Sequence, residues 1–171
     1  MDTVIVRKTS LAGVLAITPP TVFEDFRGSY VETYNLAAYR AAGIEIEFLQ
    51  DGVSTSTRHV LRGIHGNRNT WKLVSCLHGR IYLVIVNCDP DSAGFGKWEA
   101  FTCSGTNGLQ VLVPPNHGTA HLVLSEVALF NYKQSTYYDR DSQFTYRFDD
   151  PRFAIYWPVR EPILSARDRL L

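Results

Sequence analysis

The densest group of reactive side chains in the sequence lies between residues 62 and 72. Arg62, His65 and Lys72 fall where one strand-like run ends, a glycine-containing stretch follows and the next run begins, and such junctions often carry binding and catalytic groups. Side chains alternate between the faces of a regular strand, so Arg62 and His65 can share a cavity only if the strand bulges between them. We expect that bulge at Gly63. A purely structural interpretation fits these residue types equally well: Arg62 would form a surface ion pair, and His65 would be a hydrogen-bonded histidine at a strand end.

Nucleotide, hydrolase and metal motifs are missing from the sequence. It contains no G-x-G-x-x-G, and the nearest approach to a P-loop, at residues 94–97, lacks the first Gly and the final Ser or Thr. The G-x-S-x-G elbow of the α/β-hydrolases is also absent. A metal site would require strands to bring distant histidines together, because none shows H-x-H or H-E-x-x-H spacing, and we expect neither a metal nor another cofactor. The histidines are His59, His65, His78, His117 and His121.

Length, charge and cysteine content limit the class of protein. The 171 residues suit one domain, which we expect to span residues 1–171. Seventeen basic and seventeen acidic side chains cancel, so nothing indicates a nucleic-acid or membrane surface. Cys76, Cys88 and Cys103 lie in apolar runs without a C-x-x-C pair, which predicts buried thiols. Without a signal-peptide pattern or an apolar run of membrane-spanning length, a cytoplasmic protein is expected.

Short apolar, β-branched and aromatic runs separated by Gly, Pro, Asn and Asp predict an all-β sandwich or barrel. One short helix is expected at residues 36–42, with Asn35 as its N-cap and Gly43 in the left-handed position at its end. His78-Gly79 and Asn107-Gly108 each separate two runs in the manner of a two-residue hairpin turn. The clearest strand-like runs are residues 29–34, 45–50, 60–65, 72–77, 80–87, 110–114 and 128–134.

Several segments, taken in order over nearly the whole chain, resemble the dTDP-4-keto-6-deoxyglucose 3,5-epimerases of rhamnose synthesis. The resemblance implies a cupin-type double-stranded β-helix, or jelly-roll barrel, with a few short helices. It also implies an isomerase of deoxysugar biosynthesis, for a surface polysaccharide such as lipopolysaccharide or for a glycosylated metabolite. The expected reaction inverts carbon 3, carbon 5 or both of a nucleotide-linked 4-keto-6-deoxy sugar. The segments are residues 23–32, 48–56, 60–65, 72–74, 95–98, 132–133, 137–138, 157–158 and 163–168.

The resemblance also implies a catalytic set. His65 would remove the proton beside the ketone, and Asp168 would hold its ring and stabilise the imidazolium. The hydrogen beside the ketone is far less acidic than imidazolium, whose pKa is about 6.5, so the base alone would not suffice. Lys72 would therefore face the enolate oxygen and stabilise its negative charge. Tyr132 matches the family's acid, which returns a proton to the opposite face, and an ordinary phenol with a pKa of about 10 starts protonated.

Each role has a structural alternative. Ser165 and Asp168 fit the S-x-x-D capping box, in which the carboxylate only satisfies a helix start. Only three residues follow Asp168, so that helix would be very short and a functional role is favoured. Lys72 fits a solvated strand lysine, and Tyr132 a strand tyrosine with its hydroxyl at the rim.

Scattered side chains would bind the nucleotide. The resemblance assigns diphosphate contacts to two arginines, which suit forked bonds to phosphate oxygens, stacking on the base to two tyrosines, and polar base or ribose contacts to a Glu and a Gln. It also implies a homodimer with exchanged N-terminal strands, in which two copies complete the site. The nucleotide-binding residues are Arg27, Arg62, Tyr30, Tyr138, Glu32 and Gln50.

The sequence departs from the family pattern at two places. An aromatic and an amide usually follow the base, whereas Gly66 and Asn67 follow it here, which predicts a different pocket. Thr119 stands where a second active-site histidine is usual, and His121 lies two residues later, either as its substitute or as a core histidine. We include Asn67, Thr119 and His121 in the expected substrate site. Gly66 after the base, with Thr70 and Trp71 before Lys72 and Leu73, resembles the branch that handles GDP-linked 4-keto-heptoses, so the nucleotide is either dTDP or GDP.

Four functions remain open at this point. A metal-free epimerase ranks first, and a cupin 3,4-ketoisomerase acting on the same substrates ranks second. A metal-dependent cupin enzyme using His65, His117 and His121 is third, followed by a non-catalytic sugar or nucleotide binding module.

Overall fold

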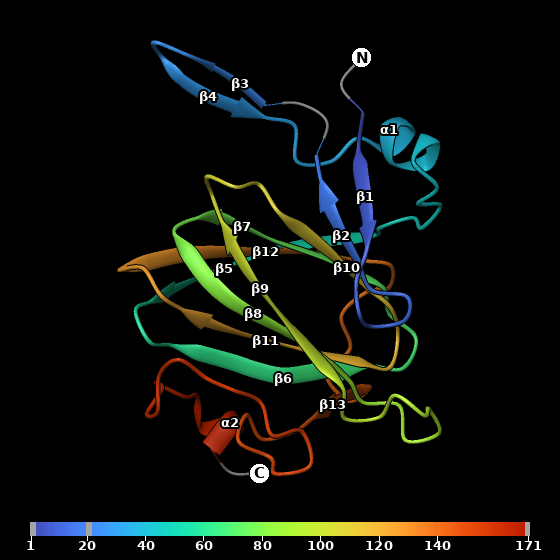
Figure 1. The fold of residues 1–171 in the computed structure, drawn as a ribbon, viewed down its shortest axis with the longest axis vertical. Helices are drawn as coiled ribbons and strands as arrows, with labels where there is room; N and C mark the ends of the chain where they lie inside the picture. Colours follow the sequence, from blue (N-terminus) through green and yellow to red (C-terminus); the bar gives the residue numbers. More distant parts are fainter. Residues whose placement is uncertain (1–2, 20–21, 170–171) are drawn as a thin grey trace.

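The computed structural model describes residues 3–19 and 22–169 and contains two antiparallel sheets that face each other (Figure 1). One sheet has the strand order β1-β2-β10-β7-β12-β5 and the other β13-β6-β11-β8-β9. This is the all-β jelly roll that was expected. The elements are β1 (Ile5–Lys8), β2 (Leu15–Thr18), β3 (Val22–Asp25), β4 (Gly28–Val31), α1 (Leu36–Ala41), β5 (Gln50–Thr57), β6 (Leu61–Asn67), β7 (Lys72–His78), β8 (Arg80–Asn87), β9 (Trp98–Ser104), β10 (Gln110–Val113), β11 (His117–Val123), β12 (Val127–Gln134), β13 (Gln143–Thr145) and α2 (Ala166–Arg169).

The main core fills the space between the two sheets. Alternate residues of each strand point inward, as in β8, where Ile81, Leu83 and Ile85 are all fully buried. They pack with Val74 of β7 and Val111 of β10 from the facing sheet. Burying one such side chain stabilises the fold by about 1.5–3 kcal/mol. The apolar core therefore offsets the cost of keeping a polar cavity at one side of the barrel.

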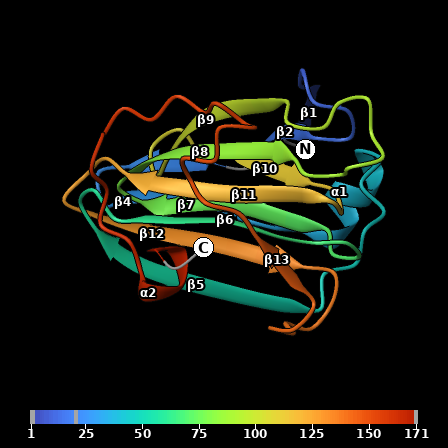
Figure 2. The same cartoon turned by 90° about the horizontal axis from the view of Figure 1, so that it is seen from below.

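Two further layers cover the outer faces of the sheets. Tyr39 of α1 and Ile44 pack with Leu73 and Leu112 on the outside of the six-stranded sheet. The chain after β13 runs across the outside of the five-stranded sheet (Figure 2), where Phe153 packs with buried side chains of β6, β8 and β11.

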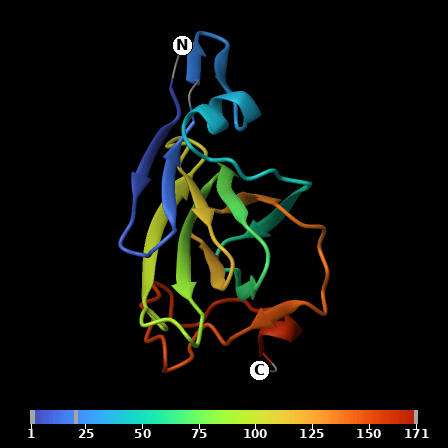
Figure 3. The ribbon, with the colours of Figure 1, turned by 90° about the vertical axis from the view of Figure 1, so that its right-hand side faces the viewer.

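The hairpin β3–β4 extends away from the barrel beyond α1 (Figures 1 and 3). Its aromatic side chains are open to solvent, with Phe26 99% exposed and Phe23 and Tyr30 62% exposed each. Arg27 folds back on Asp25, with 2.6 Å between Nη2 and Oδ2. The hairpin therefore presents exposed apolar rings and charged side chains to solvent in this single copy.

The predicted helix is confirmed. It spans Leu36–Ala41, the Asn35 side chain accepts a hydrogen bond from the Ala38 N–H, and Gly43 has a φ of +86°. The three cysteines are buried and free, as expected.

The two predicted hairpins are wrong. Gly79 and Gly108 do have positive φ values, +76° and +60°. However, β7 and β8 lie in different sheets, as do β9 and β10, so both turns carry the chain across the barrel. A turn sequence reports the local backbone conformation and carries no information about which strand becomes the partner.

The strand expected at residues 45–50 is also wrong, and the run at 29–34 ends earlier than expected. Residues 45–49 are irregular and cover the outer sheet face, and β5 begins only at Gln50. The second strand of the N-terminal hairpin is Gly28–Val31. β5 is an edge strand of mostly polar residues, so it lacks the apolar run by which the other strands are recognised.

Candidate active site

A cavity of about 340 Å³ opens between the two sheets, where residues from both sheets and the C-terminal segment converge. The C-terminal segment is held there by two backbone hydrogen bonds of Ile163, from Leu61 N at the start of β6 to Ile163 O and from Ile163 N to His59 O in the turn before β6. The wall consists of Ser54, Arg62, His65, Lys72, Val74, Thr119, His121, Phe130, Tyr132, Gln134, Tyr138, Gln143, Ser165, Arg167 and Asp168.

The predicted bulge at Gly63 is confirmed, and it explains how Arg62 and His65 both reach the cavity. Against β11, His65 pairs with Thr119 but Arg62 pairs with His121, so β6 has one more residue than its partner over this stretch. Gly63 has a φ of +122°, and a Cβ there would lie 2.5 Å from the carbonyl oxygen of Thr119. Only glycine fits this position.

His65 and Asp168 meet although they lie 103 residues apart, with 2.6 Å between Nε2 and Oδ1. The His65 side chain is 26% exposed and that of Asp168 only 3%. Burial alone would raise the pKa of Asp168, but the hydrogen bonds and positive charge around it, chiefly from His65, hold that pKa below its ordinary value. The carboxylate is therefore ionised and accepts from the imidazole.

Ser165 fixes the other side of the carboxylate. Its hydroxyl donates to Asp168 Oδ2 at 2.9 Å and accepts from the Asp168 backbone N–H at 3.2 Å. Asp168 thus lies in the first turn of α2, in the predicted S-x-x-D box, and holds His65 at the same time. The capping box predicted for Asp168 is confirmed, and its catalytic role stays a prediction.

Lys72 points into the cavity from β7 and is 9% exposed. Burial, followed by repulsion from Arg167, lowers the pKa of Lys72 to about 8. Arg167 donates to Thr145 Oγ1 at 2.6 Å. Within residues 3–19 and 22–169, no carboxylate lies within ion-pair distance of the Lys72 ammonium.

Tyr132 comes from β12, two residues after Phe130, so both rings face the cavity. Their centroids are 5.9 Å apart. Tyr132 lies directly opposite Gly52 of β5, and its hydroxyl end rests against that glycine.

His121 is a buried histidine that nevertheless lines the cavity. Its ring stacks on Phe130 with 4.0 Å between centroids and 17° between planes. Burial, then the charges of Arg62 and His65, lower the pKa of His121 to about 3, so it is neutral. Among the described residues, its Nε2 has no hydrogen-bond partner. Thr119, at the position of the family's second histidine, donates from Oγ1 to the His65 carbonyl at 3.3 Å.

The other predicted binding residues divide into two groups. Arg62 and Tyr138 line the cavity, and Gln50 lies beside it, where its Oε1 accepts from the Tyr138 N–H at 2.7 Å. Arg27 and Tyr30 are in the β3–β4 hairpin, and neither is in the cavity wall.

Glu32 and Asn67 also lie outside the cavity wall. Glu32 accepts from Asn35, and the Asn67 amide donates to Ser142 Oγ at 2.7 Å. A Cβ at Gly66 would lie 2.1 Å from the Phe144 ring, so this departure from the family pattern is filled by Phe144 from β13.

Sequence reasoning missed several wall residues. Arg167 precedes Asp168 directly, and Gln134 lies two residues after Tyr132 on the same face of β12, so strand alternation could have identified the second of these. The Gln134 Nε2 is buried without a partner among the described residues.

The described residues contain no cluster of three or more His, Cys, Asp or Glu side chains that could hold a metal ion. Within the same ranges, no helix is long and apolar enough to cross a membrane.

Comparison with known proteins agrees with this geometry. The family model for dTDP-4-dehydrorhamnose 3,5-epimerase matches residues 8–171. The chain is 39% identical over 169 residues to the dTDP-4-dehydrorhamnose 3,5-epimerase of Escherichia coli, covering 96% of this chain and 91% of that protein.

Two solved structures share the fold closely. The dTDP-6-deoxy-D-glucose-3,5-epimerase of Legionella pneumophila, in complex with dTDP-4-keto-L-rhamnose, is 34% identical with a TM-score of 0.91 and coverage of 97% and 90% of the two chains. The dTDP-4-dehydrorhamnose 3,5-epimerase of Bacillus anthracis, with TDP and PPi bound, is 34% identical with a TM-score of 0.92 and coverage of 99% and 98%. The chain belongs to the dTDP-4-dehydrorhamnose 3,5-epimerase family of cupin-type isomerases and is a sugar-nucleotide epimerase.

Proposed function

We propose that this enzyme inverts carbon 3, carbon 5 or both of a nucleotide-linked 4-keto-6-deoxy sugar, with His65 as the base and Tyr132 as the acid. The observation that carries the proposal is the 2.6 Å bond between His65 and a buried, ionised Asp168. This pair lies in the wall of a cavity that Lys72 and Tyr132 also line.

Asp168 determines which nitrogen of His65 acts. Because the ionised carboxylate accepts from Nε2–H, the neutral ring keeps its lone pair on Nδ1, and that nitrogen takes the substrate proton. The resulting imidazolium forms a charge-assisted bond with Asp168, which is stronger than the bond made by the neutral ring. The pair therefore stabilises the transition state more than the ground state.

Lys72 supplies the positive charge that stabilises the enolate oxygen. The proton leaves a carbon next to the ketone, and the negative charge moves to the ketone oxygen as the enolate forms. A donor aimed at such an oxygen contributes about 3–4 kcal/mol to catalysis in other enzymes. With a pKa of about 8, Lys72 is mostly protonated at neutral pH and carries the necessary charge.

Tyr132 completes inversion by returning a proton to the face opposite His65. Its strand, β12, belongs to the six-stranded sheet, whereas His65 is in the five-stranded sheet, and the cavity lies between them. A flat enolate held between the sheets would have one group on each side.

The substrate is proposed to carry dTDP, as the dTDP-4-keto-L-rhamnose bound to the Legionella relative does, with GDP as the other option. Arg62, Gln50 and Tyr138 lie at the cavity and would contact it. Arg27, Tyr30 and Glu32 would come from a second copy, with the N-terminal strands exchanged in a homodimer. The exposed rings of the β3–β4 hairpin, which projects from the barrel, support this arrangement.

The test is incubation with dTDP- and GDP-linked 4-keto-6-deoxy sugars in D2O, followed by proton and carbon NMR. Deuterium at carbon 3 or 5 together with the inverted product is expected with one of the two nucleotides. Absence of exchange at every ring carbon with both would refute the proposal. A product with its ketone at carbon 3 would instead identify a 3,4-ketoisomerase.

A further inference from the structure

Gly52 is a glycine in the middle of β5 that the backbone does not need. Its φ lies outside the left-handed region, so any residue could adopt its conformation. Glycine inside a strand weakens it and commonly marks a point where another group approaches closely. The reason for glycine at this position must therefore be space.

The group that occupies this space is the Tyr132 phenol. Tyr132 and Gly52 are direct partners across the β5–β12 ladder, so side chains at both positions would project to the same, cavity-facing side. A Cβ built on residue 52 lies 3.0 Å from both Cζ and Oη of Tyr132. The hydroxyl end of the phenol thus lies across β5, in the place that a side chain at 52 would take.

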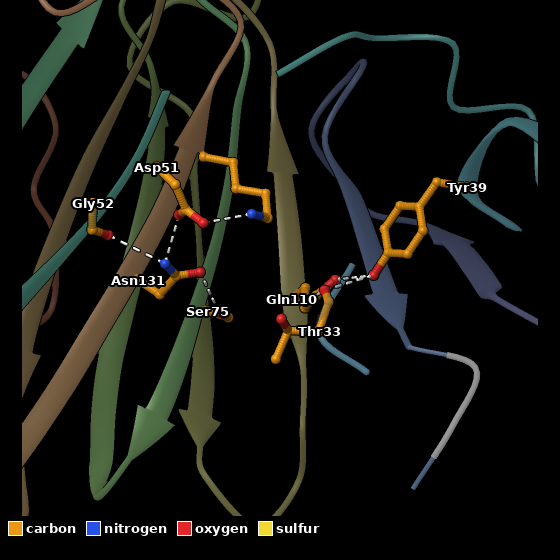
Figure 4. Close-up of polar contacts among 8 residues, drawn as sticks. Thr33, Tyr39, Asp51, Gly52, Ser75, Gln110 and Asn131 are labelled. Atoms are coloured by element: carbon orange, nitrogen blue, oxygen red, sulfur yellow. Dashed lines mark hydrogen bonds and ion pairs between the residues drawn. The ribbon is translucent and has the colours of Figure 1, made fainter. Parts of the chain in front are cut away.

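β5 is anchored to β12 from the opposite face. The Asn131 amide donates to the Gly52 carbonyl at 3.2 Å and to Asp51 Oδ1 at 2.8 Å (Figure 4). Lys133 adds an ion pair to Asp51 Oδ2 at 2.6 Å. Because the backbone of residues 51 and 52 is held in this way, an added methyl group would displace the Tyr132 side chain rather than the strand.

We infer that Gly52 is a positioning residue for the epimerisation: by lacking a side chain, it sets the position of the Tyr132 hydroxyl in the cavity. The inference rests on the proposed role of Tyr132 as the acid. Gly52 would govern the return of the proton and leave its removal by His65 almost unaffected.

Gly52→Ala separates these two steps when it is assayed in D2O with the 4-keto sugar nucleotide that the wild type turns over. NMR gives the inverted product, and mass spectrometry gives deuterium in the recovered starting isomer, which reports proton removal and return on the His65 side. His65 can exchange its proton with solvent because its side chain is 26% exposed. A displacement of a few tenths of an ångström should lower inversion about tenfold while exchange changes by less than about twofold.

Two comparisons control the measurement. Val53→Ala alters the neighbouring residue, whose exposed side chain projects to the other face of β5, and should change neither rate. In the Tyr132→Phe background, Gly52→Ala should have no further effect, since the hydroxyl it displaces is gone. Alanine is at least as favourable as glycine inside a strand, so the melting temperature should not fall.

Inversion at the wild-type rate in Gly52→Ala would overturn the inference, as would an equal fall in exchange and inversion, or a persisting effect in the Tyr132→Phe background. Failure of the proposed function would look different, because Tyr132→Phe alone would then invert the substrate normally.

Discussion

Replacing Asp168 by Asn tests whether the buried carboxylate activates His65. The change keeps the size of the side chain and the backbone N–H that bonds Ser165 Oγ, so the first turn of α2 should survive. It removes the negative charge that faces the imidazolium at 2.6 Å.

The expected loss follows from that contact. A hydrogen bond to a charged group contributes about 1.5–3 kcal/mol, which corresponds to roughly 10- to 150-fold in rate. The Asn amide can also donate to Nε2, which would place the ring proton on Nδ1 and remove the basic nitrogen, so the loss should be about 100-fold or more. Because the bond strengthens only as His65 becomes charged, kcat should fall and KM should change little.

Steady-state kinetics measure kcat and KM, and deuterium exchange measures proton removal. Exchange should fall together with inversion when the base is impaired. Ser165→Ala is the matched control: it removes the hydroxyl bond to Oδ2 but keeps the charge, so its loss of kcat should be roughly tenfold or less. Asp168→Asn with kcat within threefold of the wild type, in a protein of unchanged melting temperature, would refute the reasoning.

Three more perturbations follow from burial and packing. Lys72→Met should lower kcat about 100-fold and yet raise stability at pH 7 by up to about 3 kcal/mol, because a pKa lowered to about 8 means that the folded state disfavours the charged lysine. Between pH 8 and about 10.5, Lys72 of the wild type is deprotonated in the folded state but protonated in the unfolded chain, so the stability of the wild type should rise with pH over this range. Chemical denaturation of both proteins across the range would show whether the variant lacks that rise. Gly63→Ala should destabilise by about 3 kcal/mol or more, since the added Cβ would lie 2.5 Å from a backbone oxygen at a φ of +122°; a melting temperature equal to that of the wild type would contradict this. His121→Phe keeps the stacking on Phe130 and removes a nitrogen without a partner, so thermal unfolding should show a gain of about 1 kcal/mol, and a loss would mean that the nitrogen is satisfied in solution.

The sequence predicts the parts of the fold that local chemistry determines. The helix at 36–41 follows from Asn35 as its cap and Gly43 at its end, and β8 has the predicted bounds because its apolar run is continuous. The sheet to which each strand belongs cannot be predicted in this way. The turns at Gly79 and Gly108 have the same local conformation whether the chain reverses within one sheet or crosses to the other. β5 was mislocated because its ladder to β12 is made by the backbone, and polar side chains contribute little periodic signal.

In the candidate site, too, local rules predict some features and not others. The bulge at Gly63 could be derived because two reactive residues three apart cannot share a face of a regular strand, and the register against β11 bears this out. The meeting of His65 with Asp168 came only from family resemblance, since no local rule joins residues 103 apart. Gln134 was missed although strand alternation from Tyr132 places it in the wall, because a lone glutamine suggests no chemistry until its amide is found buried without a partner.

Asp168 closes the first turn of α2 and hydrogen-bonds His65 at the same time, so the helix cap and the proposed catalytic contact are one arrangement. A helix of the length of α2, Ala166–Arg169, is far too short to be stable alone. It is stabilised by contacts outside itself, among them the His65 bond to Asp168 and the Arg167 bond to Thr145. The same carboxylate that orients the ring therefore holds the C-terminal segment against the barrel. Losing the His65 contact should therefore loosen this segment, and faster amide hydrogen exchange at residues 165–169 in His65→Ala would reveal that coupling.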